Sequence, residues 1–259
     1  MNETLRLLAE RGSVRAYQNK PIDQDHIQQL KQATLRAPTA GNMMLYSVIE
    51  VKDQDKKDRL ALLCDNQSMI SKAPLVWVFV ADYQKWADYF ISSGAVDLGI
   101  EQGIPHRTPV TGDLFISLCD ALIAAQTAVV AAESLGIGSC YVGDILENYE
   151  SVAETLNLPK HTLPITLVCF GYPKKKPAPG KVPRCSADDI FHTDTYHRKN
   201  ADEFSAMYHE MDEKNKKQKR YNTCPGVENL GQYYYIRKHT SEFMKEMDRS
   251  VKEMLKNWG

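Results

Sequence analysis

The sequence of 259 residues predicts a mixed α/β fold of the α+β class, in which helices pack on both faces of a single sheet. Residues 74–83 and 163–173 are continuous apolar runs of β-forming residues, which is typical of strands covered on both faces. Helical patterns alternate with strand patterns early in the chain and dominate it late. No repeat and no long flexible linker interrupts this order.

In the first third of the chain, each predicted element has a local signal at one of its ends. Gly12 ends the first amphipathic segment, and Pro38 limits the second because proline cannot continue a helix. Pro21 and Asp23 mark the start of that second helix. The predicted elements are a helix at 3–12, a helix at 21–38, a strand at 46–51, a charged helix at 53–64 and the strand at 74–83.

The later chain begins with residues 84–113, a mixed segment with several glycines and prolines that we interpret as a lid or insertion. The last helix carries an apolar stripe at helical spacing, formed by Phe243, Met247, Val251 and Leu255. The elements predicted between these two segments and at the end are an apolar helix at 114–135, a short strand at 139–145, a helix at 148–159, the strand at 163–173, an extended arm at 174–184, a polar helix at 201–221 and the amphipathic helix at 239–259.

The apolar stretch at 114–136 is long enough to span a membrane, but it contains Asp120, Gln126 and Glu133. Polar groups every turn or two are expensive in lipid. We therefore expect a buried or interface helix and no membrane span.

Charge and cysteine usage restrict the class of protein further. The chain has 32 basic and 33 acidic side chains, so no global field favours nucleic acid or an anionic membrane. None of the six cysteines forms a CxxC pair, and the charged N-terminus does not have the pattern of a signal peptide. We expect reduced thiols and a cytoplasmic protein without a metal site.

Two arginines and a serine stand close together in RGSVR, at Arg11, Ser13 and Arg15. Guanidinium groups bind phosphate oxygens in pairs, so this set suits a phosphate. The alternative is a solvated turn with surface arginines.

The loop RAPTAGN offers small residues and Asn42 between a helix and a strand, where backbone can approach a flat ligand. A plain turn explains it equally well. The segment ESLGIGSCYVGDI is not a dinucleotide fingerprint, because its glycines follow a helix instead of opening one. The arm KKKPAPGKVPR is either a phosphate clamp or a solvated basic loop.

Taken in order and spacing, RGSVRAY, APTAGN, AAESLGIGSCYVGDI and LPITLVCFGYPKKKPAPGKVPR resemble the FMN-dependent nitroreductase family. The length and helical C-terminal part are similar to its oxygen-insensitive, NADPH-preferring branch, which includes flavin reductases. The resemblance implies a nitroreductase-like fold with a central, mostly antiparallel sheet flanked by helices. It divides the chain into an FMN-binding core at 1–190, with the lid at 84–113, and a helical extension at 191–259 that wraps the core or the partner subunit.

The resemblance also implies the FMN contacts, while the catalytic chemistry belongs to the cofactor and not to a side chain. Arg11 and Ser13, with Gly12 between them, would contact the phosphate and ribityl chain, and Arg15 the pyrimidine edge of the ring. The other implied contacts are the loop residues Pro38, Thr39, Ala40 and Asn42, the amide of Gln67, the ring neighbours Tyr141, Val142 and Gly143, and the phosphate-closing side chains Lys181 and Arg184.

The implied activity is hydride transfer from NADPH or NADH through FMN to nitroaromatics, quinones or similar acceptors in a ping-pong cycle. The implied assembly is a homodimer with the flavin at the subunit interface, to which helix 114–133 is suited. Two alternatives remain open: an NAD(P)H:flavin reductase that supplies free reduced flavin, and a non-enzymatic flavin-binding sensor. The basic run at 214–220 is either a solvated face or a clamp for the 2′-phosphate of NADPH.

Overall fold

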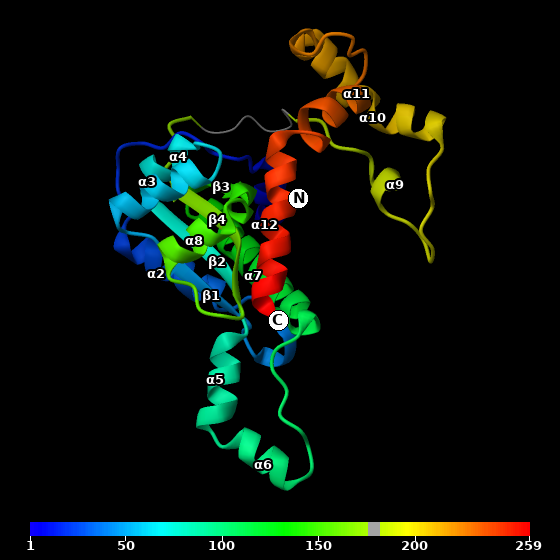
Figure 1. The fold of residues 1–259 in the computed structure, drawn as a ribbon. Coiled ribbons are helices and arrows are strands. Elements are labelled where there is room, and N and C mark those ends of the chain that lie inside the picture. The colour runs from blue at the N-terminus through cyan, green and yellow to red at the C-terminus, as the bar shows by residue number, and fades with distance from the viewer. Residues whose placement is uncertain (176–181) are drawn as a thin grey trace. The chain divides into compact units, whose positions relative to one another are not determined.

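The structure is a computed structural model that describes residues 1–175 and 182–259, and it confirms the α+β fold. Figure 1 shows its central sheet, which has the strand order β1-β2-β4-β3 with every neighbouring pair antiparallel. The strands are β1 (Tyr46–Glu50), β2 (Leu75–Asp82), β3 (Gly138–Val142) and β4 (Thr162–Gly171).

Strand β2 is buried on both faces, which explains its continuously apolar sequence. Trp77 and Phe79 pack in one core cluster together with residues of helices α7 (Thr111–Ser134) and α2 (Gln24–Thr34). Val76 and Val78 pack in a second cluster, with residues of α3 (Gln54–Leu63) and α8 (Tyr149–Leu156). Because successive side chains of a strand point to opposite faces, one apolar run supplies both cores.

Every predicted helix is present. Five further α-helices lie in the described residues: α5 and α6 within the predicted lid, and the shorter helices α4, α9 and α11. Helices of four or five residues have too few turns to produce an apolar period, so the sequence did not indicate α4, α9 or α11. The predicted strand at 139–145 ends at Val142 and continues as a 3-10 turn. The remaining helices are α1 (Glu3–Glu10), α4 (Ser68–Lys72), α5 (Gln84–Ser92), α6 (Ala95–Glu101), α9 (Ala187–Ile190), α10 (Ala201–Lys217), α11 (Leu230–Tyr234) and α12 (Glu242–Trp258).

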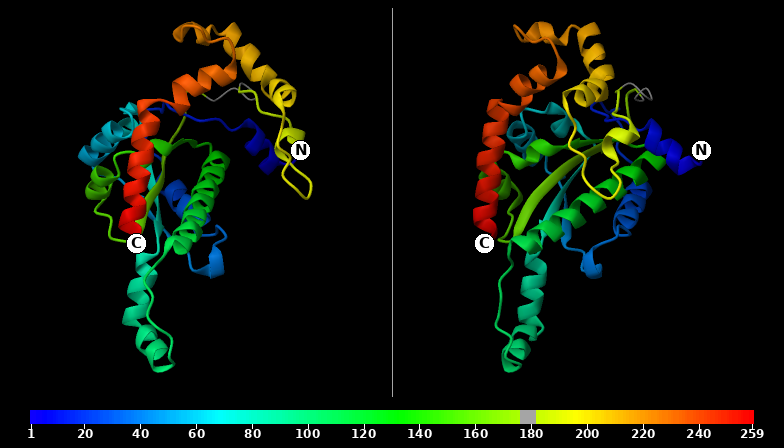
Figure 2. Two further views of the ribbon diagram at one scale, coloured as in Figure 1. Left: turned by 45° about the vertical axis from the view of Figure 1, so that its right-hand side comes forward. Right: turned by 90° about the vertical axis from the view of Figure 1, so that its right-hand side faces the viewer.

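Helix α7 carries the long apolar segment and packs against β2 and β4 (Figure 2). It is the one helix in the described residues that could cross a membrane by length and composition, and 44% of its most apolar window is buried in the fold. Ala124 and Ala128 are fully buried on its inner side, whereas Phe115 and Leu122 are exposed on the other side. The helix is therefore a core helix with a second apolar face that this chain leaves uncovered.

The segment 84–113 folds as α5 and α6 followed by an extended return to α7. Figures 1 and 2 show both helices projecting beyond the end of the sheet. Tyr89, Ile91 and Leu98 expose more than half of their surface there.

The predicted stripe on the last helix borders its buried face, and Val251 of this stripe packs against the core. Ser250, Met254 and Trp258 are the buried residues of α12, and Leu255 is 45% exposed. The Ser250 hydroxyl donates to the Leu146 carbonyl oxygen at 2.6 Å and accepts from the Tyr149 N–H at 3.0 Å. A small polar residue therefore faces inward because it satisfies backbone groups at the start of α8, which apolar periodicity cannot reveal.

The chain forms two compact units, residues 1–179 with 246–259, and residues 180–245. In the second unit, the carboxylate of Asp212 accepts from the Tyr221 hydroxyl at 2.6 Å and the Leu230 N–H at 2.7 Å. Lys216, from the basic run, pairs with the same carboxylate at 2.7 Å. The expected division at residue 190 stays a prediction, and the end of α12 packs with the first unit.

Candidate functional site

The RGSVRAY segment is held against the sheet by backbone pairing. Ser13 forms a parallel bridge with Ser139 of β3, and the Val14 N–H donates to the Ser139 carbonyl oxygen at 2.9 Å. Tyr17 bridges Pro173 in antiparallel fashion after β4. Val14 and Tyr17 are buried in the core, while Ser13 and Arg15 are exposed, so the polar side chains of this segment point outward.

Two glycines make this pairing possible. A Cβ atom at Gly138 would lie 2.5 Å from Val14 Cγ2, and one at Gly171 would lie 2.7 Å from Tyr17 Cδ1. Gly138 therefore allows the segment with Arg11 and Arg15 (the arginine segment) to pack closely on the sheet.

The arginine segment offers positive charge that forms no ion pair with a carboxylate among the described residues. Arg11 follows α1 and is half-buried, and its Nε is buried without a hydrogen-bond partner in the described residues. Neither Arg11 nor Arg15 pairs with a carboxylate in the described part of the chain. The Ser139 hydroxyl beside them is also buried and unpartnered. Buried donors of this kind normally have a partner, so the set fits an anionic ligand.

Gln67 is brought to the end of β3 by one side-chain bond. Its Nε2 donates to Oδ2 of Asp144 at 2.7 Å, in the turn that follows β3. Tyr141 is half-buried and donates its hydroxyl to Gln126 of α7 at 3.2 Å. Val142 is 1% exposed and packs in the second core cluster, so only its backbone can face a ligand.

The loop with Pro38, Thr39, Ala40 and Asn42 follows α2 and is mostly exposed. Asp120 of α7, which is 2% exposed, holds it: Oδ1 accepts from the Ala40 N–H and Oδ2 from the Leu45 N–H, both at 3.0 Å. Gly41 and Asn42 have φ angles of 56° and 58°, which glycine and asparagine tolerate best. This role of Asp120 was not predicted from the sequence, although a carboxylate on the inner side of an apolar helix is a signal for it.

The predicted site residues fall into two sets along α7. Arg11, Ser13, Arg15, Gln67 and residues 141–143 gather around β3, and Tyr141 contacts Gln126. The loop at 38–42 is anchored at Asp120, six residues earlier on the same helix, which is roughly 9 Å along its axis. Arg184 lies in the second compact unit. Lys181 lies outside the described residues, so the predicted phosphate contacts of these two side chains stay predictions.

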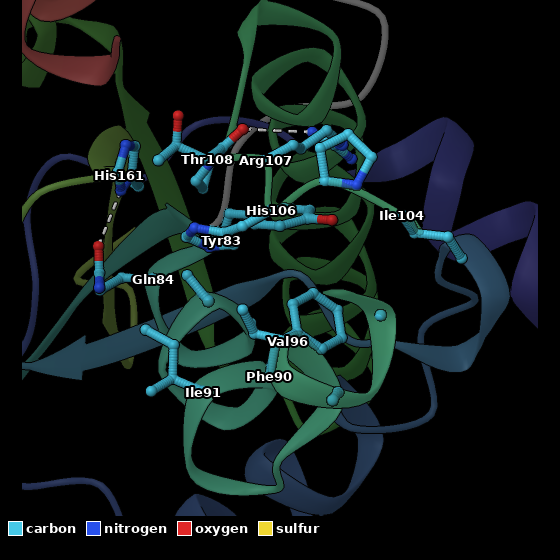
Figure 3. Close-up of a pocket in the computed structure, with 15 residues that line it drawn as sticks. Tyr83, Gln84, Phe90, Ile91, Val96, Ile104, His106, Arg107, Thr108 and His161 are labelled. Carbon is cyan, nitrogen blue, oxygen red and sulfur yellow. Dashed lines mark hydrogen bonds between the residues drawn. The ribbon is translucent and has the colours of Figure 1, made fainter. Parts of the chain in front are cut away.

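Two of the cavities in the first unit are relevant to the predicted site and the predicted lid. One of about 440 Å³ is lined by the 84–113 segment, and Figure 3 shows Phe90 and Val96 lining it and Gln84 bonded to His161 at its edge. None of the described residues predicted to bind FMN lines it. The second, of about 710 Å³, is lined by Arg15 and by three lysines, Lys20, Lys72 and Lys174. Positive charge therefore surrounds the hollow beside Arg15.

A buried carboxyl close to the site makes stability depend on pH. Burial and the carboxylates of Asp144, Asp65 and Glu246 raise the pKa of Glu147 from 4.5 to about 7. A folded-state pKa above the unfolded value means that ionisation opposes folding, so stability falls as pH rises from about 4.5 to about 7 and stays lower above that range.

We expect Glu147→Gln to raise the free energy of unfolding by about 1–3 kcal/mol at pH 8 and to change it little at pH 5. Urea unfolding at both pH values measures this. Glu150→Gln is the matched control, and its effect on stability should have the opposite sign. The Arg249 guanidinium lowers the pKa of Glu150 to about 2, so the ionised carboxylate of Glu150 stabilises the fold above pH 4.5. Equal effects of Glu147→Gln at pH 5 and pH 8 would contradict the raised pKa.

Comparison with known proteins decides the family. Residues 8–172 match the nitroreductase family. The chain belongs to the nitroreductase family. A Bacillus subtilis protein named FMN reductase (NAD(P)H) is 29% identical over 242 residues, which cover 90% of this chain and 92% of that protein. Another, named FMN reductase (NADPH), is 31% identical over 79% of this chain and 78% of its own. The structure of the NfrA1 nitroreductase from B. subtilis matches with a TM-score of 0.78 at 28% identity, over 98% of this chain and 100% of that one.

The side chains of this family member fit FMN. A phosphate has oxygens for the unpaired guanidinium of Arg11 and the hydroxyl of Ser13. The buried, unpartnered Arg11 Nε and Ser139 Oγ are donors that a bound anion would satisfy. Arg15 and the Gln67 amide offer polar contacts to the edge of a planar ring.

Proposed function

We propose that this protein is an FMN-dependent oxidoreductase that transfers hydride from NADPH or NADH to nitroaromatics, quinones or similar small molecules. The observation that best supports the proposal is the pair of guanidiniums at Arg11 and Arg15, which form no ion pair in the described part of the chain, with Ser13 between them bridged to β3. Relatives named FMN reductase over most of this chain support it.

In this proposal, Arg11 and Ser13 bind the phosphate of FMN and the ribityl chain beside it. Arg15 stabilises negative charge at the pyrimidine edge of the ring, because a fixed cation in a site without water favours an anion strongly. The backbone at Tyr141, Val142 and Gly143 faces the ring. The chemistry that bound FMN supplies is two-electron transfer, in which NAD(P)H is oxidised first and the acceptor is reduced afterwards at the same site.

Two alternatives use the same residues. A flavin reductase would reduce free flavin as its acceptor, and relatives named FMN reductase favour this variant. A flavin-binding sensor would bind FMN without turnover, and the membership in a family of reductases argues against it.

Anaerobic addition of NADPH to the purified yellow protein tests the proposal. We expect the oxidised flavin band to bleach rapidly and to return on addition of a quinone, and steady-state plots with both substrates varied to be parallel. A flavin band that does not bleach would favour the sensor. Intersecting plots would exclude the shared-site cycle.

We also propose a homodimer with the flavin at its interface. Two observations support it: the exposed apolar face of α7, with Phe115 and Leu122, and the separation of the two predicted contact sets along that helix. A second copy would supply the 38–42 loop to the β3 set of its partner. The 84–113 segment would be the lid, and residues 191–259 would wrap the core or the partner. Sedimentation of the FMN-loaded protein as a monomer would argue against this assembly.

A cytoplasmic location completes the proposal. All six cysteines are free thiols, which is usual where the environment is reducing. Fractionation of cells that express the protein measures its location.

A further inference from the structure

The bond between Gln67 and Asp144 joins two segments that are far apart in the sequence. Gln67 immediately precedes α4, and Asp144 lies in the turn directly after β3. The Gln67 Nε2 and Asp144 Oδ2 atoms are 2.7 Å apart, and both residues are half-buried. This short contact lies next to Gly143, which is one of the residues expected to face the flavin ring.

The chemistry of the pair selects one orientation of the amide. An ionised carboxylate only accepts hydrogen bonds, so it can bind the NH2 end of a carboxamide and not the oxygen end. Because the NH2 end points to Asp144, Oε1 is left as an acceptor for another group. Without the carboxylate, the two ends of the amide could exchange at little cost.

A flavin presents one N–H donor, N3–H, on its pyrimidine edge. We propose that Asp144 is a positioning residue that holds the Gln67 carboxamide with Oε1 directed to accept the hydrogen bond of flavin N3–H. The inference rests on the proposed function, since it requires FMN at the β3 set.

The carboxylate also adds negative charge at this end of β3. Asp65, Glu147 and Glu246 are further carboxyl groups in the same surroundings, since Asp144, Asp65 and Glu246 all raise the pKa of Glu147. Negative charge opposes the addition of electrons to a bound ring. Asp144 therefore has two separable effects: the bond orients Gln67, and the charge lowers the reduction potential of bound FMN.

Three variants separate the effect of the Asp144–Gln67 hydrogen bond from the effect of the negative charge on Asp144. We expect Asp144→Ala to raise the Kd of FMN about tenfold, the size of one hydrogen bond to a charged group. Asp144→Asn keeps an acceptor for Nε2, so its Kd should stay within about twofold of wild type while its reduction potential rises. Asp65→Asn is the matched control, because it removes a neighbouring charge that does not bind Gln67, and its Kd should not change.

A donor–acceptor exchange gives the decisive readout. Gln67→Glu alone places two carboxylates against each other and should lose FMN binding at pH 8. Combining it with Asp144→Asn restores one donor facing one acceptor and should recover most of the binding. Kd is measured by quenching of FMN fluorescence, and thermal melting of the FMN-free proteins checks that each variant folds.

The outcomes distinguish this inference from the proposed function. Wild-type protein that does not take up FMN would overturn both. Wild-type protein that binds FMN, together with Asp144→Ala binding equally well or no recovery in the exchange variant, would overturn the positioning role alone.

Discussion

Replacement of Arg11 by alanine is expected to weaken FMN binding by about 10–100-fold without loss of folding stability. A hydrogen bond to a charged group contributes about 1.5–3 kcal/mol, and a guanidinium on a phosphate makes up to two of them. In the FMN-free protein Arg11 forms no ion pair among the described residues, and its Nε is buried without a partner. Its removal therefore takes nothing from the fold that urea unfolding would detect.

The control for this variant is Arg6→Ala. Arg6 lies on α1, the helix that Arg11 follows, but it is exposed and donates a hydrogen bond to Glu10 at 3.3 Å. It should leave the Kd of FMN unchanged. A Kd for Arg11→Ala within twofold of wild type, measured by fluorescence quenching, would remove the phosphate role of this arginine.

Replacement of Asp120 by alanine is expected to lower the free energy of unfolding by about 3–5 kcal/mol and to abolish FMN binding. The carboxylate accepts from the Ala40 and Leu45 N–H groups at 3.0 Å each. Its removal leaves the buried Leu45 N–H without a partner and frees the 38–45 loop, and breaking a bond to a buried charged group costs about 1.5–3 kcal/mol.

The Asp120→Asn variant should lie between these limits, because an amide keeps one acceptor and turns a donor toward the second N–H. Thr127→Ala is the control on the same helix, since Thr127 is bonded only within α7, to the Ile123 carbonyl oxygen at 2.8 Å. Urea unfolding measures stability, and limited proteolysis reports on the loop. Asp120→Ala with the stability of Thr127→Ala would contradict the anchor.

Most of the secondary structure could be predicted because its signals are local. β2 (Leu75–Asp82) was predicted within one residue at each end, since a strand covered on both faces must be apolar throughout. The most buried face of α12 is shifted by one residue from the predicted stripe, because the choice of inward face depends on what lies opposite. Ser250 faces inward to bond with Leu146 and Tyr149, and no period within the helix contains that information.

The types of residue in the candidate site could be predicted from the sequence. The residues that hold them in place could not. Arg11, Ser13 and Arg15 stand out as charged and polar groups in an extended segment, and the structure bridges Ser13 to Ser139 of β3. Asp120 was noticed only as a polar residue unsuited to lipid, and Asp144 was not considered. Their roles depend on contacts across 80 and 77 positions of the chain, to Ala40 and Gln67.

The sequence by itself determined the strands, the main helices and the ordered motifs of the nitroreductase family, and it singled out Arg11 and Arg15 as candidates for binding an anion. These follow from properties that act over a few residues, such as side-chain alternation, proline and glycine conformation, and charge. The tertiary structure alone decided that Asp120 anchors the 38–42 loop, that Asp144 orients Gln67 and that Gly138 receives Val14. Each of these depends on which distant groups approach within hydrogen-bond or van der Waals distance, and only the packing of the whole sheet brings them together.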